Sequence, residues 1–212
     1  LALLYFRRSG VEWAVLEVGM GGRLDATNVV TPELTLVTSV SLDHAEHLGS
    51  TLPEVAGEKA GIFKSQVPVL SARQPEAAAR VIRERALALE APLFSAGEDF
   101  SWQSIDRGFR YQGMDLNLDG LTSGLAGRHQ LENLSLALAA AELLMRQGVA
   151  LGCDVLRQGV AAVRWPGRLE WLPDRVLLDG AHNPAGAEVL GNYLLESGLD
   201  RVHWIAGLKA DK

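Results

Sequence analysis

The stretch Leu16-Glu17-Val18-Gly19-Met20-Gly21-Gly22-Arg23-Leu24-Asp25-Ala26-Thr27-Asn28 contains a carboxylate, three glycines, an arginine and a second carboxylate. The run before it, Val11–Leu16, is apolar enough to predict a buried parallel strand. Open α/β sheets bind ligands at the carboxyl ends of such strands, where glycines let the backbone approach a ligand closely. Glu17 supplies the hard oxygen donor that Mg²⁺ prefers. A tight turn with a capping acid would use the same residues, so the spacing alone leaves both interpretations open.

A second predicted strand, Glu33–Leu42, ends in Asp43-His44. If the two strands are adjacent and parallel, Glu17 and His44 can face one ion. Imidazole is a softer ligand than Mg²⁺ usually takes, so the residue types alone favour Zn²⁺ or Mn²⁺. An Asp-His pair after a strand is also common in an ordinary turn, and the pattern by itself does not decide between the two.

The remaining pattern predicts an α/β fold with a parallel sheet, helices on both of its faces and a small antiparallel meander. The expected elements are a helix from the capping box Thr51-Leu52-Pro53-Glu54 to about Phe63, a strand Val67–Ser71, a helix Pro75–Glu90, a strand Pro92–Ser95, the meander Asp99–Leu125, a helix from Gly127 to Arg146 and a short helix Asp154–Val163. The alternating aromatic side chains of the meander fit core packing better than a stacking platform.

The string Trp165-Pro166-Gly167-Arg168 breaks this pattern and predicts a linker between two domains, residues 1–165 and 166–212. Beyond the linker, the sequence predicts the start of a second α/β domain. Its expected elements are a strand Arg175–Leu178, a helix capped by Asn183-Pro184 and a strand Arg201–Ala206, followed by Gly207-Leu208-Lys209-Ala210-Asp211-Lys212. We interpret Leu1–Phe6 as the end of a buried helix, and the whole chain as a fragment of a longer protein.

Three polar positions allow either a chemical or an ordinary role. Lys59, on a predicted helix, is most simply a solvated charge. Asn133 belongs to a polar cluster that opens a helix, where it could act as a plain cap or lie at the edge of a bound nucleotide. Arg168 has a guanidinium fork that pairs well with phosphate oxygens, but it could also occupy a simple Pro-Gly turn.

The composition excludes several classes of protein. The 212 residues carry a net charge of −6, so no basic face suggests nucleic acid or an anionic membrane as a partner. Cys153 is the only cysteine, which excludes a disulfide framework and fits a reducing, cytoplasmic setting. We expect no signal peptide and no transmembrane segment. Without coiled-coil heptads, we expect a monomer.

The string Glu17–Asn28 resembles the signature of folylpolyglutamate synthase and the bifunctional dihydrofolate synthase/folylpolyglutamate synthase, members of the Mur ligase superfamily. Four further strings are similar to this family and occur in its order: Leu42-Asp43-His44, Glu58-Lys59-Ala60-Gly61-Ile62, His129-Gln130 with Asn133, and Leu178-Asp179-Gly180-Ala181-His182-Asn183-Pro184. The linker with Arg168 is similar to the family's Pro-Gly-Arg hinge. The family's phosphate-binding loop, Gly-x-x-x-x-Gly-Lys-Ser/Thr, does not occur in these residues, and we expect it upstream.

This resemblance implies an ATP-dependent ligase that adds L-glutamate to dihydropteroate or tetrahydrofolate through an acyl phosphate. It implies Mg²⁺ as the metal, with Glu17 and His44 as its ligands. It implies catalytic roles for Lys59 and His182, where Lys59 is carbamylated and therefore needs a partly buried, neutral amine. It implies ATP contacts for Asn133, Arg168 and Asp179, and pteroate contacts for Leu24, Asp25 and Ala26.

Several alternatives remain open at this point. Another acid substrate of the same superfamily, as in peptidoglycan-precursor or cyanophycin-type ligases, is disfavoured by the Gly-Gly-Arg-Leu-Asp-Ala-Thr-Asn and Asp-Gly-Ala-His-Asn-Pro strings. The sequence does not distinguish an enzyme that adds the first glutamate from one that adds later glutamates or does both. The 212 residues by themselves are expected to be an inactive piece that at most binds nucleotide weakly.

Overall fold

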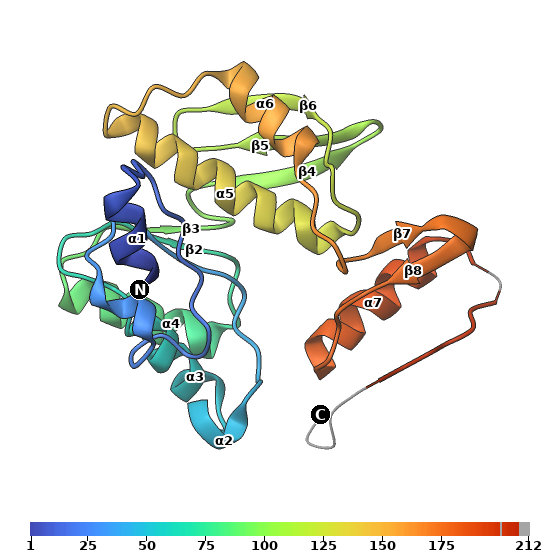
Figure 1. Ribbon diagram of the computed structural model, residues 1–212, viewed down its shortest axis with the longest axis horizontal. Helices are drawn as coiled ribbons and strands as arrows, with labels where there is room; N and C mark the ends of the chain where they lie inside the picture. The colour runs from blue at the N-terminus through green and yellow to red at the C-terminus, as the bar shows by residue number, and fades with distance from the viewer. Residues whose placement is uncertain (200, 208–212) are drawn as a thin grey trace.

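The computed structural model describes residues 1–199 and 201–207, and its centre is a three-stranded parallel sheet with helices on both faces (Figure 1). The strands lie in the order β1-β2-β3 and are β1 (Thr35–Val37), β2 (Val69–Ser71) and β3 (Leu93–Ser95). The main helices around the sheet are α3 (Leu52–Ala60), α4 (Glu76–Ala88) and α5 (Arg128–Arg146). This confirms the predicted parallel α/β sheet, although its strands are shorter than the apolar runs suggest.

Strand β2 shows why both faces of the sheet are covered. Successive side chains of a strand point to opposite faces, and β2 buries Val69 and Leu70 completely. Val69 belongs to the apolar cluster with α3 and α4, whereas Leu70 belongs to the cluster with α5. A strand without a polar face is typical of a sheet that is buried on both sides.

The predicted capping box begins α3, as expected. The Thr51 hydroxyl accepts a hydrogen bond from the Glu54 N–H at 3.4 Å, and the Glu54 carboxylate accepts one from the Thr51 N–H at 3.0 Å. These bonds satisfy amide groups that have no partner within the helix. The helix ends at Ala60 rather than Phe63, because Gly61, Ile62 and Phe63 form a turn behind it.

The predicted meander is confirmed as a small antiparallel sheet packed on α5. Its elements are β4 (Ser101–Ile105), β5 (Gly108–Gln112) and β6 (Asn117–Leu121), and α6 (Cys153–Ala162) lies beside β6. Phe109 and Tyr111 are fully buried, which confirms core packing for these aromatic side chains.

A buried carboxylate ties the meander to α5. The Glu142 carboxylate accepts hydrogen bonds from the Tyr111 hydroxyl at 2.9 Å and from the backbone N–H groups of Met114, Asp115 and Leu116. Burial, together with the nearby Glu142 charge, raises the pKa of Tyr111. Since a buried carboxylate is costly unless it is fully hydrogen-bonded, these four donors fix the β5–β6 turn against the helix.

The C-terminal part of the described chain contains a hairpin and a helix, and we refer to it as the C-terminal unit. Its elements are β7 (Glu170–Leu172), the short 3₁₀ helix η2 (Pro173–Arg175), β8 (Val176–Leu178) and α7 (Pro184–Glu196). Strands β7 and β8 pair antiparallel, and the sequence pattern missed β7. The unit lies beside the rest of the molecule and follows the segment after α6 (Figure 1). The predicted domain boundary between residues 165 and 166 stays a prediction and falls in that segment.

Two predicted strands are wrong. Val11–Leu16 forms no strand and pairs with no neighbour in the described part of the chain, and Val15 is fully exposed. Arg201–Ala206 forms none either, and Ile205 is fully exposed. A strand needs a neighbour for its backbone N–H and C=O groups, and neither β1 nor β8 pairs with these runs. Of the segment Gly207–Lys212 that follows the second of these predicted strands, residues 208–212 lie outside the described part of the chain.

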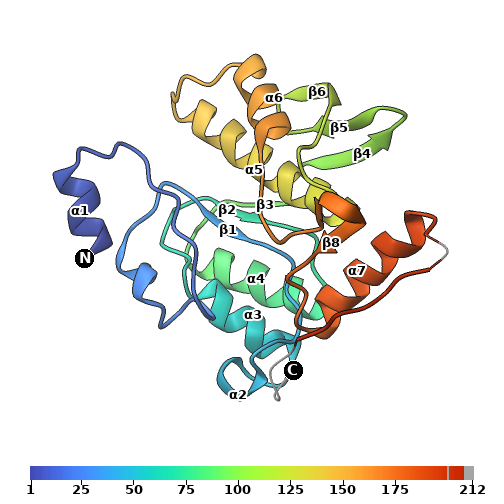
Figure 2. The same cartoon turned by 45° about the vertical axis from the view of Figure 1, so that its right-hand side comes forward.

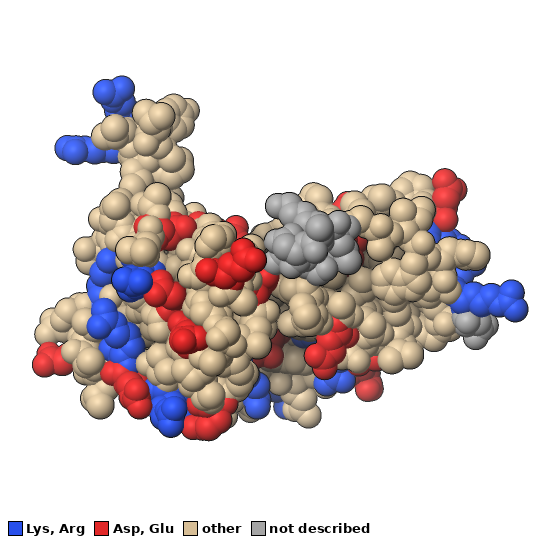
Figure 3. All heavy atoms as spheres, turned by 90° about the horizontal axis from the view of Figure 1, so that it is seen from below, with Lys and Arg blue, Asp and Glu red and all other residues tan. Residues whose placement is uncertain are grey.

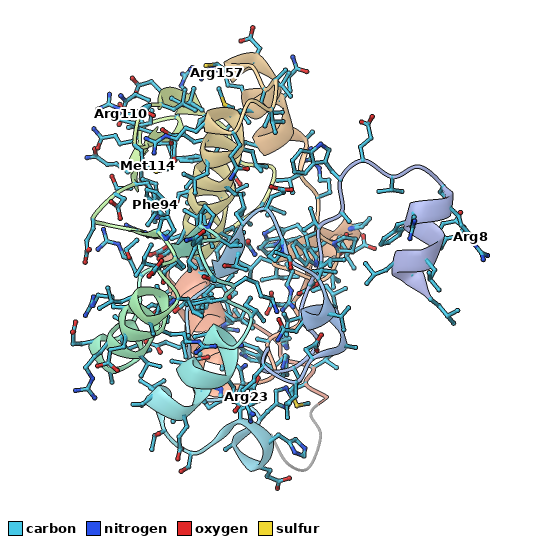
Figure 4. All side chains as sticks on the ribbon, turned by 90° about the vertical axis from the view of Figure 1, so that its left-hand side faces the viewer. Arg8, Arg23, Phe94, Arg110, Met114 and Arg157 are labelled. Carbon is cyan, nitrogen blue, oxygen red and sulfur yellow. The ribbon has the colours of Figure 1, made fainter. Side chains whose placement is uncertain are left out.

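The N-terminal helix was predicted to be buried, and this is also wrong. Helix α1 (Ala2–Arg8) has no buried residue, and it stands apart from the sheet and its helices (Figure 2). In Figure 4 the side chain of Arg8 points away from the rest of the protein. Helix α1 therefore contributes no side chain to the hydrophobic core of the described residues.

The surface carries charges of both signs. On the face seen in Figure 3, Lys and Arg side chains lie among Asp and Glu side chains rather than in one field. Among the helices that the structure describes, none combines the length and apolar character needed to cross a membrane.

Candidate functional site

The carboxylate of Asp25 organises the glycine-rich loop. One of its oxygens accepts hydrogen bonds from the N–H groups of Gly19 at 3.0 Å and Met20 at 3.2 Å. The other accepts from the Thr27 hydroxyl at 2.6 Å and the Thr27 N–H at 2.8 Å, which caps the 3₁₀ helix η1 (Ala26–Val29). These bonds, with that of the Thr27 hydroxyl foremost, lower the pKa of Asp25 to about 2. Asp25 is therefore ionised at neutral pH, and its hydrogen bonds hold the two ends of the loop together.

The loop lies directly on the backbone of α3. The Arg23 N–H donates to the Glu58 carbonyl at 2.9 Å, and the Arg23 guanidinium pairs with the Glu58 carboxylate at 3.0 Å. A Cβ on Gly22 would lie 2.8 Å from the Glu58 carbonyl oxygen, which is closer than side chains tolerate. Figure 4 shows Arg23 beside this helix. Close packing therefore requires glycine at position 22, because a side chain there would push the loop away from the backbone of α3.

The loop forms one wall of a cavity of about 250 Å³. Lys59 reaches the cavity from α3, and Asp43 and His44 reach it from the turn that precedes the short helix α2 (Ala45–Leu48). Asn183 of the C-terminal unit completes the lining. His44 and Lys59, which the sequence motifs single out separately, thus share one cavity, and Lys59 is half-buried.

Glu17 directly precedes the cavity in the chain but is not one of its lining residues. It is exposed and precedes the lining residues Val18–Gly21. The parallel strand that was predicted to place Glu17 does not form, so the pairing of Glu17 with His44 at one ion stays a prediction. Leu24 and Ala26, on either side of Asp25 in the chain, are exposed.

A second polar group forms where the linker meets the C-terminal unit. The Asp179 carboxylate accepts from the Leu169 N–H at 2.9 Å and from the Ala181 N–H at 2.8 Å. Burial and the Arg168 guanidinium lower the pKa of His129, while the Asp179 charge acts in the opposite direction. Arg168, Asp179 and a largely neutral His129 therefore lie within electrostatic range of one another.

Asn133 belongs to the same region through α5. It lies four residues after His129, so both side chains occupy one face of the helix. Its amide donates to the Gln130 side-chain oxygen at 3.1 Å, and the residue is exposed. The residue of α5 that interacts electrostatically with Arg168 and Asp179 is thus His129, which the sequence motif named only beside Asn133.

Asp43 connects the C-terminal unit to the cavity. Its carboxylate accepts a hydrogen bond from the Asn183 side chain at 2.8 Å, and the His182 Nε2 atom lies 3.7 Å from the same oxygen. Sequence reasoning treated Asn183 only as a helix cap and gave Asp43 no role. The one signal that could have found this pair is that each residue adjoins a motif histidine, His44 or His182.

These residues do not preassemble a metal centre. Within residues 1–199 and 201–207, no group of three or more His, Cys, Asp or Glu is arranged to hold a metal ion. Mg²⁺ usually keeps several waters and takes one or two protein carboxylates together with substrate phosphates. The donors present fit an ion that arrives with a phosphate ligand better than one held by the protein alone.

The fold and the site define an α/β protein in which a glycine-rich loop, His44 and Lys59 line one cavity together with Asn183 from the C-terminal part of the chain. Residues 1–141 match the family described as the Mur ligase middle domain, and the chain belongs to that family.

Curated relatives extend the match beyond this domain. The dihydrofolate synthase/folylpolyglutamate synthase of Bacillus subtilis (strain 168) is 39% identical, over 91% of this chain and 47% of the relative. The folylpolyglutamate synthase of Lacticaseibacillus casei is 36% identical, over 100% of this chain and 51% of the relative. The chain thus spans about half the length of the curated relatives it matches.

Solved structures agree with the sequence matches. A structure described as an FPGS-AMPPCP-folate complex superposes with a TM-score of 0.90 at 35% identity, and covers 94% of this chain and 50% of that chain. The Escherichia coli FolC structure in complex with DHPP and ADP gives a TM-score of 0.84 at 32% identity, over 95% of this chain and 47% of that one.

Proposed function

We propose that the protein carrying this chain is an ATP-dependent amide ligase that adds L-glutamate to dihydropteroate, to a tetrahydrofolate, or to both. The observation that supports this most strongly is the shared cavity, where the anchored glycine-rich loop, His44 and Lys59 face the C-terminal unit. Relatives of the same family are named as dihydrofolate and folylpolyglutamate synthases. We also propose a cytoplasmic protein, supported by the single cysteine, and a monomer, supported by the lack of coiled-coil heptads in this sequence.

The proposed reaction has two steps. A carboxylate oxygen of the pteroate or folate substrate attacks the γ-phosphorus of ATP, so an acyl phosphate forms and ADP leaves. The amino group of L-glutamate then attacks the acyl carbon, inorganic phosphate leaves, and the amine loses a proton as the amide forms. Phosphoryl transfer of this kind depends on in-line placement and on neutralisation of negative charge.

We assign nucleotide binding to the residues between α5 and the C-terminal unit. Arg168 is suited to pair with phosphate oxygens. Asp179 and Asn133 would bind polar groups of ATP, and His182 would act beside the nucleotide. The lowered pKa of His129 favours its neutral form. Among His129, Arg168 and Asp179, the positive charge therefore belongs to Arg168.

We assign the substrate acid and the metal to the glycine-rich loop and the cavity. Leu24, Asp25 and Ala26 would contact the pteroate substrate. Glu17 and His44 would hold Mg²⁺, which neutralises phosphate charge when it is bound. Lys59, half-buried at the cavity, would be carbamylated.

The test is ADP release by the protein that carries this chain, over its whole length, with Mg²⁺, ATP and L-glutamate. The acid substrate is either 7,8-dihydropteroate or a tetrahydrofolate. Turnover with both indicates a bifunctional synthase, and turnover with one indicates the monofunctional kind. No turnover with either would contradict the folate assignment and leave another acid substrate of the family.

A pair of variants tests the nucleotide assignment. Arg168→Ala is expected to raise the KM for ATP at least about tenfold, since an arginine–phosphate pair is a strong charge-assisted hydrogen bond. Arg83→Ala is the matched control, because Arg83 makes an exposed ion pair with Glu76 at 2.7 Å on α4. Equal KM values for both variants would contradict the role of Arg168.

A further inference from the structure

The side chain of Asn183 joins two distant turns. Its Oδ1 atom accepts from the Gly186 N–H at 2.8 Å and so caps α7, while its Nδ2 group donates to Asp43 Oδ2 at 2.8 Å. Asp43 uses its other oxygen to accept from the His44 N–H at 2.8 Å. One pair of side chains therefore connects the first turn of α7 to the turn that follows β1, and 140 residues separate the two in sequence.

This contact is a polar link between the two parts of the chain. Asp43, in the part of the chain up to residue 165, accepts the hydrogen bond from the Asn183 side chain, and its Oδ2 atom lies 3.7 Å from the His182 Nε2 atom. The Asp43 side chain is only 21% exposed. A hydrogen bond to a partly shielded carboxylate is stronger than one between neutral groups in water.

The contact between Asp43 and Asn183 also lies at the cavity, because Asp43, His44 and Asn183 all line it. His44 is fixed on one side of it by the bond from its own N–H to Asp43, and Asn183 lines the same cavity. We infer that Asp43 is a positioning residue, which holds the start of α7, and with it His182, over the cavity that contains His44 and Lys59. This inference rests on the proposed ligase function, in which residues of both parts act on one nucleotide.

The side-chain chemistry permits an exchange test. In Asn183→Asp, two carboxylates face each other and the contact is lost, although aspartate still caps a helix as well as asparagine does. In Asp43→Asn, the new amide cannot accept from both the His44 N–H and the Asn183 amide. In the double variant the three hydrogen bonds named above are possible again: Asn at position 43 accepts from the His44 N–H and donates to Asp at position 183, which still accepts from the Gly186 N–H.

The measurements are steady-state kinetics and amide hydrogen exchange on the whole protein that carries this chain. Each single variant is expected to lose about tenfold in kcat/KM for ATP, the size expected for one hydrogen bond to a charged group. The double variant is expected to recover most of this loss. Tyr193→Phe is the control on α7, because it removes the acceptor of the Trp171 indole N–H at 2.9 Å inside the C-terminal unit, and it is expected to keep the parent kcat/KM.

Hydrogen exchange separates this inference from the proposed function. In both single variants, the amides of the first turn of α7 are expected to exchange faster, and the double variant is expected to restore their protection. If the parent protein shows no ligase turnover, the proposed function fails, and the exchange data alone decide whether Asp43 positions α7. Single variants with the parent's kinetics and protection, or a double variant no better than Asn183→Asp, would overturn the inference.

Discussion

At the scale of single residues, the side chains that hold the site are locked by local hydrogen bonds. Asp25 binds two loop amides and Thr27, and Asp43 binds the amide of its neighbour His44. Such bonds between a carboxylate and nearby backbone are typical of turns. They explain how a loop with three glycines can keep one conformation without regular secondary structure.

The low pKa of Asp25 gives a testable pH dependence. Hydrogen bonds from Thr27, Met20 and Gly19 favour the ionised form and lower the pKa from 3.8 to about 2. The stabilisation that Asp25 contributes is therefore complete above pH 3.8 and is lost as the pH falls through about 2. A carboxyl-carbon NMR titration is expected to find its midpoint near 2.

The variant Thr27→Val tests the cause of this shift. It keeps the shape of the side chain but removes the hydroxyl that contributes most, so the midpoint of Asp25 should move toward its ordinary value. A midpoint near 3.8 in the parent protein would contradict the described loop.

At the scale of elements, the sequence pattern predicts what depends on neighbours in the chain. The capping box at Thr51 and the Asn183-Pro184 start of α7 are both present, because each needs only a few consecutive residues. The strand at Val11–Leu16 fails, because an apolar run becomes a strand only when another strand pairs with it. Strand β7 was missed for the converse reason, since its pairing with β8 and not its three-residue pattern defines it.

The contact between the glycine-rich loop and α3 can be tested with two glycines. Gly22→Ala would put a methyl group 2.8 Å from the Glu58 carbonyl oxygen and is expected to cost about 2 kcal/mol of the free energy of unfolding. Gly57→Ala, on α3 itself, meets open space and is expected to be neutral or to stabilise by up to about 1 kcal/mol.

Urea unfolding of both variants measures this difference. If Gly22→Ala unfolds with the free energy of the parent, or if the two variants behave alike, the loop does not pack on α3 as described.

At the scale of the whole molecule, the site depends on contacts between distant residues. The pattern of residues suggested candidates such as His44, Lys59 and Asp179 one motif at a time. It could not predict that Asp43 meets Asn183, or that Glu142 holds the meander, because those contacts join residues 140 and 31 positions apart. Tertiary packing decides which side chains meet, and a linear pattern does not contain that information.

The central claim is that the protein activates a substrate carboxylate as an acyl phosphate before glutamate attacks. The most direct measurement uses 7,8-dihydropteroate or a tetrahydrofolate whose reacting carboxylate carries ¹⁸O, together with ATP, Mg²⁺ and L-glutamate. Since the carboxylate oxygen that attacks the γ-phosphorus leaves with the phosphate, the account predicts one ¹⁸O atom in each inorganic phosphate formed with amide product. Amide product accompanied by unlabelled phosphate, or by label in AMP, would contradict it.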